Sequence, residues 1–291
     1  MKAVVEGAAR CTLYGVAWVV RRIPAKMCGR VGRMIGWLWY RGVPIRRRVA
    51  RENVGRALGL TGRQRDSVVR GMYLHLGQSF VEFLRYGRGS PHRLPVKISG
   101  RAGLSSALAS GRGVILVTAH LGNWELLVRS GTLIDGPVMV VSKALKSNWA
   151  HTLWMEQRVG GADIVFPAGA ARKLVTHLRS NGVVGYVLDQ HSSSARAAWL
   201  PFFGRAAATS PDVVRLARTT GATVLPVFIR RTENTHQIEI GEAIKMPVTG
   251  DRRADELEGT RRCLQTIEEA IRRSPEQWLW IHRRWKSPPQ G

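Results

Sequence analysis

The stretch TAHLGNWE places a histidine and a glutamate five positions apart, His120 and Glu125. A histidine can take the proton of a substrate hydroxyl when a carboxylate fixes its tautomer and stabilises the imidazolium that forms. Glu125 can be that carboxylate. Such a pair would catalyse direct attack of a hydroxyl on an acyl thioester, a reaction that needs no enzyme nucleophile. The alternative interpretation is a structural hydrogen-bonded pair.

Other chemistries lack their motifs in this sequence. There is no G-x-S-x-G nucleophile elbow, and Ser79 lies in a predicted helix, which argues against a serine hydrolase. H-E-x-x-H and the Walker loop are also absent, and the glycines of GRVGRMIG have the wrong spacing for a dinucleotide fingerprint. We interpret them as helix-packing or loop glycines, and we expect neither a metal nor a resident cofactor.

The cysteines indicate a reducing environment. Cys11, Cys28 and Cys263 are odd in number and contain no close pair, which argues against a disulfide framework and a four-thiolate metal site. A location on the cytoplasmic side fits this usage.

Residues that could do chemistry need elements that position them, and from Gly113 onward short β-branched runs alternate with helical stretches. We expect strands over 114–119, 138–142, 163–166, 183–189 and 223–229, and helices over 123–132, 148–158, 169–180 and 211–220. This alternation predicts an α/β fold with a mostly parallel central sheet flanked by helices. Ligands of such sheets bind outside the carboxyl ends of the strands, where His120 lies.

Asp189 ends a predicted strand at the same edge of the sheet as His120. It can bind a substrate hydroxyl, pair with Arg158 or simply cap the strand. Arg158 itself ends a predicted helix, a position that favours cations, so a surface role is its alternative.

About twenty residues, from 190 to 210, then separate a strand from the next helix, and their aromatic and proline content predicts an ordered segment. Within it, Phe202 and Phe203 offer either an apolar wall for an acyl chain or core packing. Gly204 permits close backbone approach, and Arg205 offers a partner for a phosphate.

The N-terminal part combines apolar and arginine-rich stretches. The apolar run from Cys11 to Val20 is shorter than the roughly 20 residues that cross a bilayer, and a second apolar run, 34–40, precedes the arginines of 46–48. We expect residues 1–45 to form membrane-associating interfacial helices, with packing on the protein body as the alternative. Residues 46–291 form the second predicted unit, which begins with a helix over 66–86.

The formal net charge of +25 indicates a surface that attracts phosphates of nucleic acid or anionic lipid, or an acidic carrier protein. A genome biased toward arginine is the alternative explanation. Trp278, Trp280 and Trp285 lie among basic residues near the C-terminus, an arrangement that suits either a headgroup boundary or core packing. A non-catalytic basic protein that binds membranes or nucleic acid is a competing hypothesis. The aromatics are not interleaved for base stacking, and we expect no nucleic-acid partner.

Four stretches together resemble the lipid A biosynthesis acyltransferases and the related phosphatidylinositol mannoside acyltransferases, over roughly Arg51 to Trp285. They are HLGNWE at 120–125, MEQRVGG at 155–161, VLDQ at 187–190 leading into LPFFGRAAATSP at 200–211, and PEQWLWIHRRWK at 275–286. The wider group of glycerophosphate acyltransferases shares the spacing of histidine and acidic residue but usually has Asp.

The resemblance implies a role for several residues. It implies His120 as general base, Glu125 as its orienting carboxylate, and Arg158 and Asp189 as further active-site residues. The matching motifs add three expected substrate-binding residues, Asn123, Gly204 and Arg205.

The resemblance also implies the substrates and the location. The donor would be an acyl carrier protein or, less often, acyl-CoA, and the acceptor a hydroxyl of a lipid A precursor or related glycolipid. The enzyme would lie at the inner membrane with its active site facing the cytoplasm, on a fold like that of glycerophosphate acyltransferases. The loop QHSSSARAAW after Asp189 departs from many relatives, so acceptors such as a phosphatidylinositol mannoside or another lysolipid stay open.

Overall fold

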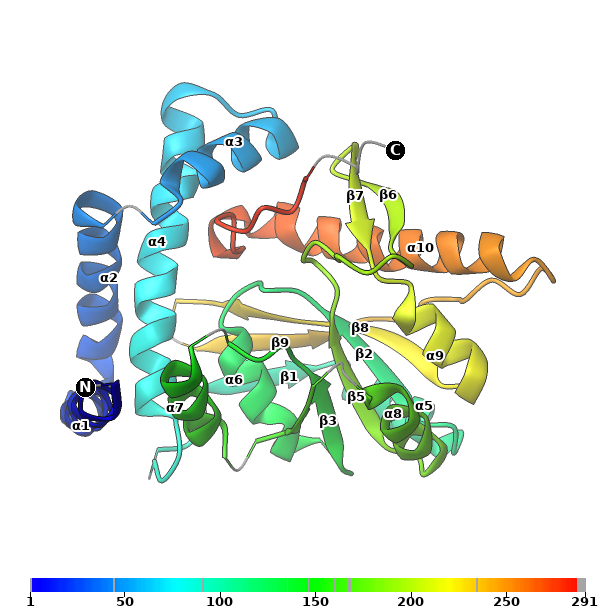
Figure 1. The fold of residues 1–291 in the computed structure, drawn as a ribbon, viewed down its shortest axis with the longest axis horizontal. Helices are drawn as coiled ribbons and strands as arrows, with labels where there is room; N and C mark the ends of the chain where they lie inside the picture. Colours follow the sequence, from blue (N-terminus) through cyan, green and yellow to red (C-terminus); the bar gives the residue numbers. More distant parts are fainter. Residues whose placement is uncertain are drawn as a thin grey trace.

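The fold is built around one seven-stranded sheet, which we describe from a computed structural model (Figure 1). The structure describes residues 2–43, 45–90, 92–134, 136–145, 147–159, 161–166, 169–233 and 235–286. The first part of the chain is helical, with α1 (Lys2–Arg22), α2 (Ala25–Gly42), α3 (Arg47–Leu58) and α4 (Gly62–Arg85). The predicted boundary at residue 45 falls between α2 and α3 and stays a prediction.

Strands and helices alternate over the rest of the chain, as expected for an α/β domain. The strands of the central sheet are β1 (Val96–Ser99), β2 (Val114–Thr118), β3 (Val138–Val141), β4 (Asp163–Val165), β5 (Val183–Val187), β8 (Thr223–Arg231) and β9 (His236–Ile240). The helices are α5 (Arg101–Ala109), α6 (Trp124–Arg129), α7 (Asn148–Arg158), α8 (Ala170–Arg179), α9 (Asp212–Thr220) and α10 (Arg252–Arg273), with short 3-10 turns η1 (Ser130–Leu133) and η2 (Pro275–Gln277).

The strand order is β1-β9-β8-β2-β5-β3-β4. β2 pairs in parallel with both β5 and β8, and β3 with both β4 and β5, whereas β9 runs antiparallel to β8. The prediction of a mostly parallel sheet flanked by helices is therefore confirmed. A separate antiparallel hairpin, β6 (Ala198–Phe202) and β7 (Arg205–Thr209), lies within the predicted ordered segment 190–210.

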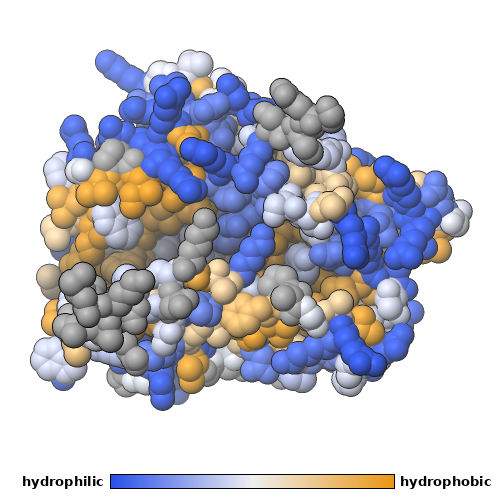
Figure 2. Space-filling view, in the orientation of Figure 1, coloured by the Kyte–Doolittle hydropathy of each residue, from blue (hydrophilic) through white to orange (hydrophobic). Residues whose placement is uncertain are grey.

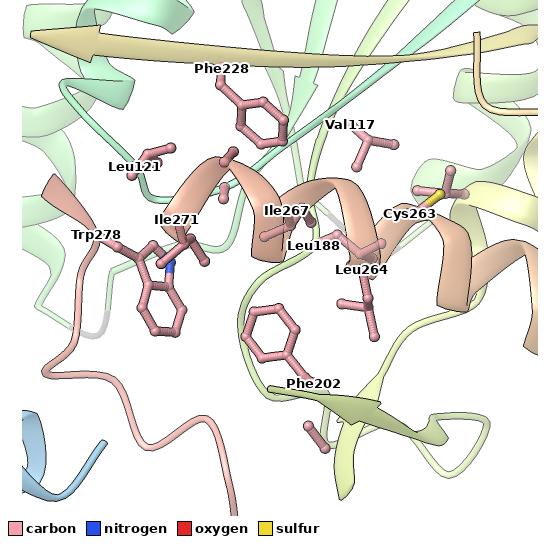
Figure 3. Packing of buried hydrophobic residues seen from close by; sticks show 14 of the residues in the cluster. Val117, Leu121, Leu188, Phe202, Phe228, Cys263, Leu264, Ile267, Ile271 and Trp278 are labelled. Atoms are coloured by element: carbon pink, nitrogen blue, oxygen red, sulfur yellow. The ribbon is translucent and has the colours of Figure 1, made fainter. Parts of the chain in front are cut away.

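Helices cover both faces of the sheet. On one face, α10 packs its apolar side, including Leu264 and Ile267, against Val117 of β2 and Phe228 of β8 (Figure 3). On the other face, Leu104 of α5 and Leu126 of α6 pack against the alternate strand residues. Because successive strand residues point to opposite faces, a strand covered on both sides, such as β2, is buried along its whole length and is apolar at four of its five positions.

Close helix packing ties the N-terminal part to the rest. A Cβ atom at Gly36 of α2 would lie 2.2 Å from the Tyr73 carbonyl oxygen of α4, and one at Gly77 would lie 2.2 Å from the Gly32 oxygen. The two backbones therefore meet where only glycine fits, and the interpretation of GRVGRMIG as helix-packing glycines is confirmed. No described helix is both long and apolar enough to cross a bilayer.

Candidate active site

His120 and Asp189 meet at the carboxyl edge of two neighbouring strands. β2 pairs with β5 so that Thr118 lies opposite Val187, and each functional residue follows its strand end by two positions. The His120 Nδ1 atom is 2.8 Å from Asp189 Oδ1, and the His120 backbone N–H donates to Asp189 Oδ2 at 2.8 Å. The parallel register of β2 and β5 therefore supplies the carboxylate that the imidazole needs.

The predicted contact between Glu125 and His120 is wrong. Glu125 is the second residue of α6, and its carboxylate turns toward α7, where Arg158 donates to it from Nε at 2.7 Å and from Nη2 at 2.9 Å. Trp124 and Trp154 donate their indole N–H groups to the same carboxylate. Among the described residues, the donors to Glu125 are therefore Arg158, Trp124 and Trp154, and His120 is not one of them.

The electrostatics of Asp189 fix the tautomer of His120. Burial alone would raise the pKa of this carboxyl, which is 2% exposed. The charge of the imidazole, hydrogen bonds from His120 and the indole N–H of Trp278 outweigh burial and hold the pKa below its usual range. An ionised Asp189 keeps the proton of His120 on Nδ1, so Nε2 is the atom that can accept a proton.

Gln190 lies directly on the imidazole. Its Nε2 atom is 3.2 Å from His120 Nε2 and 3.3 Å from Nδ1, so the amide is placed to donate to the free nitrogen. The edge of Trp124 faces the same ring, with the ring centroids 5.3 Å apart. The sequence analysis did not single out Gln190, although it follows Asp189 directly.

A cavity of about 790 Å³ opens beside His120. His120, Glu125 and Arg158 line it together with the Lys143 and Ser193 side chains at its exposed rim. Its walls are mainly apolar side chains of the sheet and of the elements that cover this face, including Ile98, Leu116, Leu127, Val128, Ile134, Val138, Val140, Val227, Ile238 and Ile240. The cavity thus reaches from β2 to β1, three strand spacings away, or roughly 14 Å.

Arg158 lines this cavity and keeps one donor without a described partner. The guanidinium lies over the Trp154 ring, 3.6 Å from its centroid, and two of its nitrogens bind Glu125. The third, Nη1, is buried and has no hydrogen-bond partner among the described residues. A buried donor without a partner is unfavourable in isolation.

The histidine loop depends on one glycine and one asparagine. Gly122 has φ +59°, and a Cβ there would lie 1.9 Å from the Ile229 carbonyl oxygen, so only glycine fits. Asn123 caps α6 by accepting from Leu126 N, and donates to Glu82 of α4 at 2.7 Å. The substrate-binding role expected of Asn123 stays a prediction, and its position here is that of a loop anchor. It is buried, does not line the cavity, and anchors the loop instead.

Gly204 and Arg205 also lie away from the cavity. Gly204, with φ +70°, is part of the turn between β6 and β7, and the Arg205 guanidinium lies 5.1 Å from the ring centroid of Trp285. The hairpin places both residues outside the cavity lining, and the expectation that they bind substrate stays a prediction. Phe202 is a core residue that packs on Trp278 (Figure 3). Phe203 is also buried and stacks on the same ring.

The C-terminal tryptophans belong to the core as well. Trp278 and Trp280 are 1% and 0% exposed, so a headgroup boundary at these two rings is excluded by their packing. Trp278 contributes more than volume, because its Nε1 donates to Asp189 Oδ2 at 2.7 Å. No motif in the sequence predicts this contact between residues 89 positions apart.

The fold and the site together define a class of α/β enzyme in which a carboxylate-supported histidine opens onto an apolar cavity. Over residues 9–287, the chain matches the model of the family described as bacterial lipid A biosynthesis acyltransferase, and it belongs to that family. It is therefore an acyltransferase, not a non-catalytic binding protein, and the resemblance found in its motifs is confirmed.

Individual relatives agree with this membership. The chain is 25% identical over 281 residues to the lipid A biosynthesis palmitoleoyltransferase of Escherichia coli, with 95% of this chain and 90% of the relative covered. It is 23% identical over 282 residues to the lauroyltransferase of the same organism, covering 95% and 91%. The phosphatidylinositol mannoside acyltransferase of Mycolicibacterium smegmatis is 27% identical over 232 residues, covering 74% and 72%.

Proposed function

We propose that this enzyme transfers a fatty acyl group from a carrier thioester to a hydroxyl of a membrane glycolipid, with His120 as general base and Asp189 as its partner. The observation that carries this proposal is the His120–Asp189 pair at the mouth of an apolar cavity. A base without an apolar cavity would suit many hydroxyl substrates. A base beside a cavity of this size and lining suits a reaction at the end of a fatty chain.

The reaction follows from the tautomer of His120. Its Nε2 takes the proton of the acceptor hydroxyl while the oxygen forms a bond to the thioester carbonyl carbon. Asp189 stabilises the imidazolium that results. The tetrahedral intermediate then breaks its carbon–sulfur bond, and the leaving thiolate takes the proton from His120. For the first proton transfer, the acceptor hydroxyl displaces the Gln190 amide from His120 Nε2 or approaches beside it.

Arg158, which lines the cavity, is proposed to bind a substrate oxygen, either the oxyanion of the intermediate or a phosphate. Glu125 holds the guanidinium in place with two hydrogen bonds and the Trp154 ring supports it from one side. A fixed, buried donor of this kind stabilises developing negative charge more than a mobile surface arginine would. In this proposal Glu125 acts through Arg158 and not through His120.

The donor is proposed to be an acyl carrier protein, with acyl-CoA as the second candidate. Both deliver the acyl chain as a thioester, and the apolar cavity between the sheet and α6 would hold that chain. The net charge of +25 favours an acidic carrier protein and an anionic bilayer as partners. No role for nucleic acid is proposed.

The acceptor is proposed to be a lipid A precursor or a related glycolipid. The E. coli relatives carry lipid A biosynthesis in their names, and the M. smegmatis relative is named for phosphatidylinositol mannoside, which makes that glycolipid the main alternative. Another lysolipid is the third candidate. Products of the reaction with each acceptor separate these cases.

The helix pair α1 and α2 is proposed to rest on the cytoplasmic face of the inner membrane. Trp18 of α1 and Met34, Trp37 and Leu38 of α2 are exposed, and Figure 2 shows apolar surface over α2. The arginines Arg22 and Arg41 lie over the Trp18 and Trp37 rings. Exposed aromatic and aliphatic side chains flanked by arginine are typical of a helix that lies in a lipid interface.

The test is a transfer assay in vesicles. The enzyme is incubated with a panel of acyl-carrier-protein and acyl-CoA thioesters and with each candidate glycolipid, and products are identified by mass spectrometry. His120→Ala is expected to lose transfer entirely while keeping the wild-type circular dichroism spectrum. His92→Ala, outside the cavity, is the matched control. A His120→Ala enzyme that turns over at the wild-type rate would contradict the proposed mechanism.

A further inference from the structure

The C-terminal segment 275–284 runs along both loops that carry the site. The Gly122 backbone N–H donates to Gln277 O at 3.0 Å, and Leu279 N donates to His120 O at 3.1 Å. Leu121 and Trp278 form an isolated antiparallel bridge between these two contacts. The segment is therefore joined to the histidine loop by backbone hydrogen bonds on either side of Trp278.

Trp278 also reaches the second loop through its side chain. Three N–H groups converge on the Asp189 carboxylate, two from His120 and one from the indole of Trp278 at 2.7 Å. Trp278 is the one donor of the three that is independent of His120. Together with the His120 backbone N–H on the same Oδ2 atom, it holds the carboxylate in place when the imidazole gains or loses a proton.

We propose that Trp278 is a positioning residue of the catalytic pair, whose indole N–H holds Asp189 so that Oδ1 faces His120 Nδ1. The proposal rests on the proposed function of His120 as general base. It assigns to the C-terminal segment a direct part in the chemistry that neither family membership nor the cavity requires.

The carboxylate is surrounded by few other charges. The charge of Asp189 favours the protonated forms of His282 and Arg284 in the same segment, and His120 faces the carboxylate directly. Burial lowers the pKa of His282 to about 4, so this histidine is neutral at working pH. Arg284 keeps its charge and donates to the backbone at Gln190 and Ala208. Removing the indole N–H therefore leaves the other charges in place and changes only the stabilisation of the carboxylate.

The expected direction follows from that loss. A carboxylate that accepts one hydrogen bond fewer is more basic, and it stabilises the imidazolium more strongly. The apparent pKa of the His120–Asp189 pair therefore rises, whichever of the two residues carries the proton. The acid limb of the pH–rate profile moves upward, because the base must be deprotonated to act.

Trp280 provides a matched control. It is as buried as Trp278, and the two rings contact each other with centroids 4.5 Å apart. Its indole N–H, however, donates to the Pro275 carbonyl at 2.7 Å and not to the site. Trp278→Phe and Trp280→Phe thus remove the same atoms from the same core, and only the first removes a donor from Asp189.

The experiment compares the two variants in the full-length enzyme. Trp278→Phe is expected to raise the acid limb of kcat/KM by about one pH unit and to lower kcat about tenfold, because a hydrogen bond to a charged group is lost. The KM for the acyl donor should change less than about twofold. Trp280→Phe should leave the acid limb in place. Equal shifts in both variants, or no shift in either, would overturn the proposal.

Two further measurements keep the test decisive. If Trp278→Phe fails to fold, 3-benzothienylalanine at position 278 keeps the bicyclic ring and removes only the N–H, and the same shift is expected. Histidine ring NMR titrations of wild type and Trp278→Phe, assigned with His120→Gln, read the pair without turnover. An enzyme that shows the titration shift but no acyl transfer would refute the proposed function and still support the positioning role. If wild type transfers acyl groups but the His120 titration is the same in wild type and in Trp278→Phe, the positioning role is refuted and the proposed function stands.

Discussion

Replacing Asp189 by asparagine is the sharpest test of the arrangement at the site. The carboxylate accepts from His120 Nδ1 on one oxygen and from the His120 backbone and Trp278 on the other, at 2.7–2.8 Å. An amide has only one acceptor oxygen, so in either orientation its NH2 group faces an N–H donor. If the NH2 faces Nδ1, the imidazole must carry its proton on Nε2 instead. Nε2 then cannot accept a proton from the acceptor hydroxyl, and His120 cannot act as a base.

The magnitude follows from the loss of tautomer control and of imidazolium stabilisation. In serine proteases the corresponding change lowers kcat about 10⁴-fold. We expect a loss of about 10³- to 10⁴-fold for Asp189→Asn, which corresponds to roughly 4–5.5 kcal/mol in the activation free energy. The opposed donors in the core should also lower the free energy of unfolding by about 1–3 kcal/mol.

The assay is the initial rate of transfer from a labelled acyl carrier protein in vesicles, with urea unfolding to confirm the fold. Glu125→Gln is the companion variant, because glutamine still offers Arg158 one acceptor oxygen. We expect its loss to be nearer 10- to 100-fold, since it loosens the arginine that is proposed to bind substrate and leaves the proposed base intact. An Asp189→Asn enzyme within about threefold of wild type, beside an inactive Glu125→Gln, would refute the reasoning and return the orienting role to Glu125.

Three more outcomes are expected. Ile98→Phe on the edge strand should shorten the cavity and lower kcat/KM for the longest accepted acyl chain about tenfold, with shorter chains unaffected; a chain-length profile checks this. Burial lowers the pKa of His75 to about 3. Below about pH 6.5 the unfolded chain therefore binds more protons than the native one, and the free energy of unfolding decreases as the pH is lowered. Urea unfolding should show that His75→Gln flattens this slope by up to about 1.4 kcal/mol per pH unit between pH 6.5 and 5. Trp18→Glu should weaken binding to anionic vesicles about tenfold in a sedimentation assay, whereas Val248→Glu on an exposed loop should not; equal effects would point to bulk charge.

The central sheet was predictable because its strands are buried on both faces. β2 reads VILVT with every residue buried, and a short apolar run of this kind, preceded by a glycine, is typical of a central strand covered by helices on both faces. α7 has the bounds that its helical spacing predicted, 148–158. β1 and β9 escaped prediction because VKIS and HQIEI alternate apolar and polar residues over only four or five positions, as an edge or half-buried strand does.

The partner of His120 shows where sequence spacing fails. Glu125 is the nearer carboxylate along the chain, but α6 turns it toward Arg158. Asp189 is 69 positions away and becomes the neighbour because β5 lies beside β2. The signal that both residues end strands at one edge was present in the sequence. Deciding between the two carboxylates required the strand order, which is a property of the whole sheet.

The contact between Trp278 and Asp189 sets an order of events during synthesis. Asp189 leaves the ribosome about 90 residues before Trp278 does, a delay of roughly 4–18 s at typical elongation rates, and His120 leaves earlier still. Through that interval the nascent chain can fold its sheet but has a carboxylate with one donor missing. The carboxylate therefore gains its full set of donors only after the stretch around Trp278 has been made.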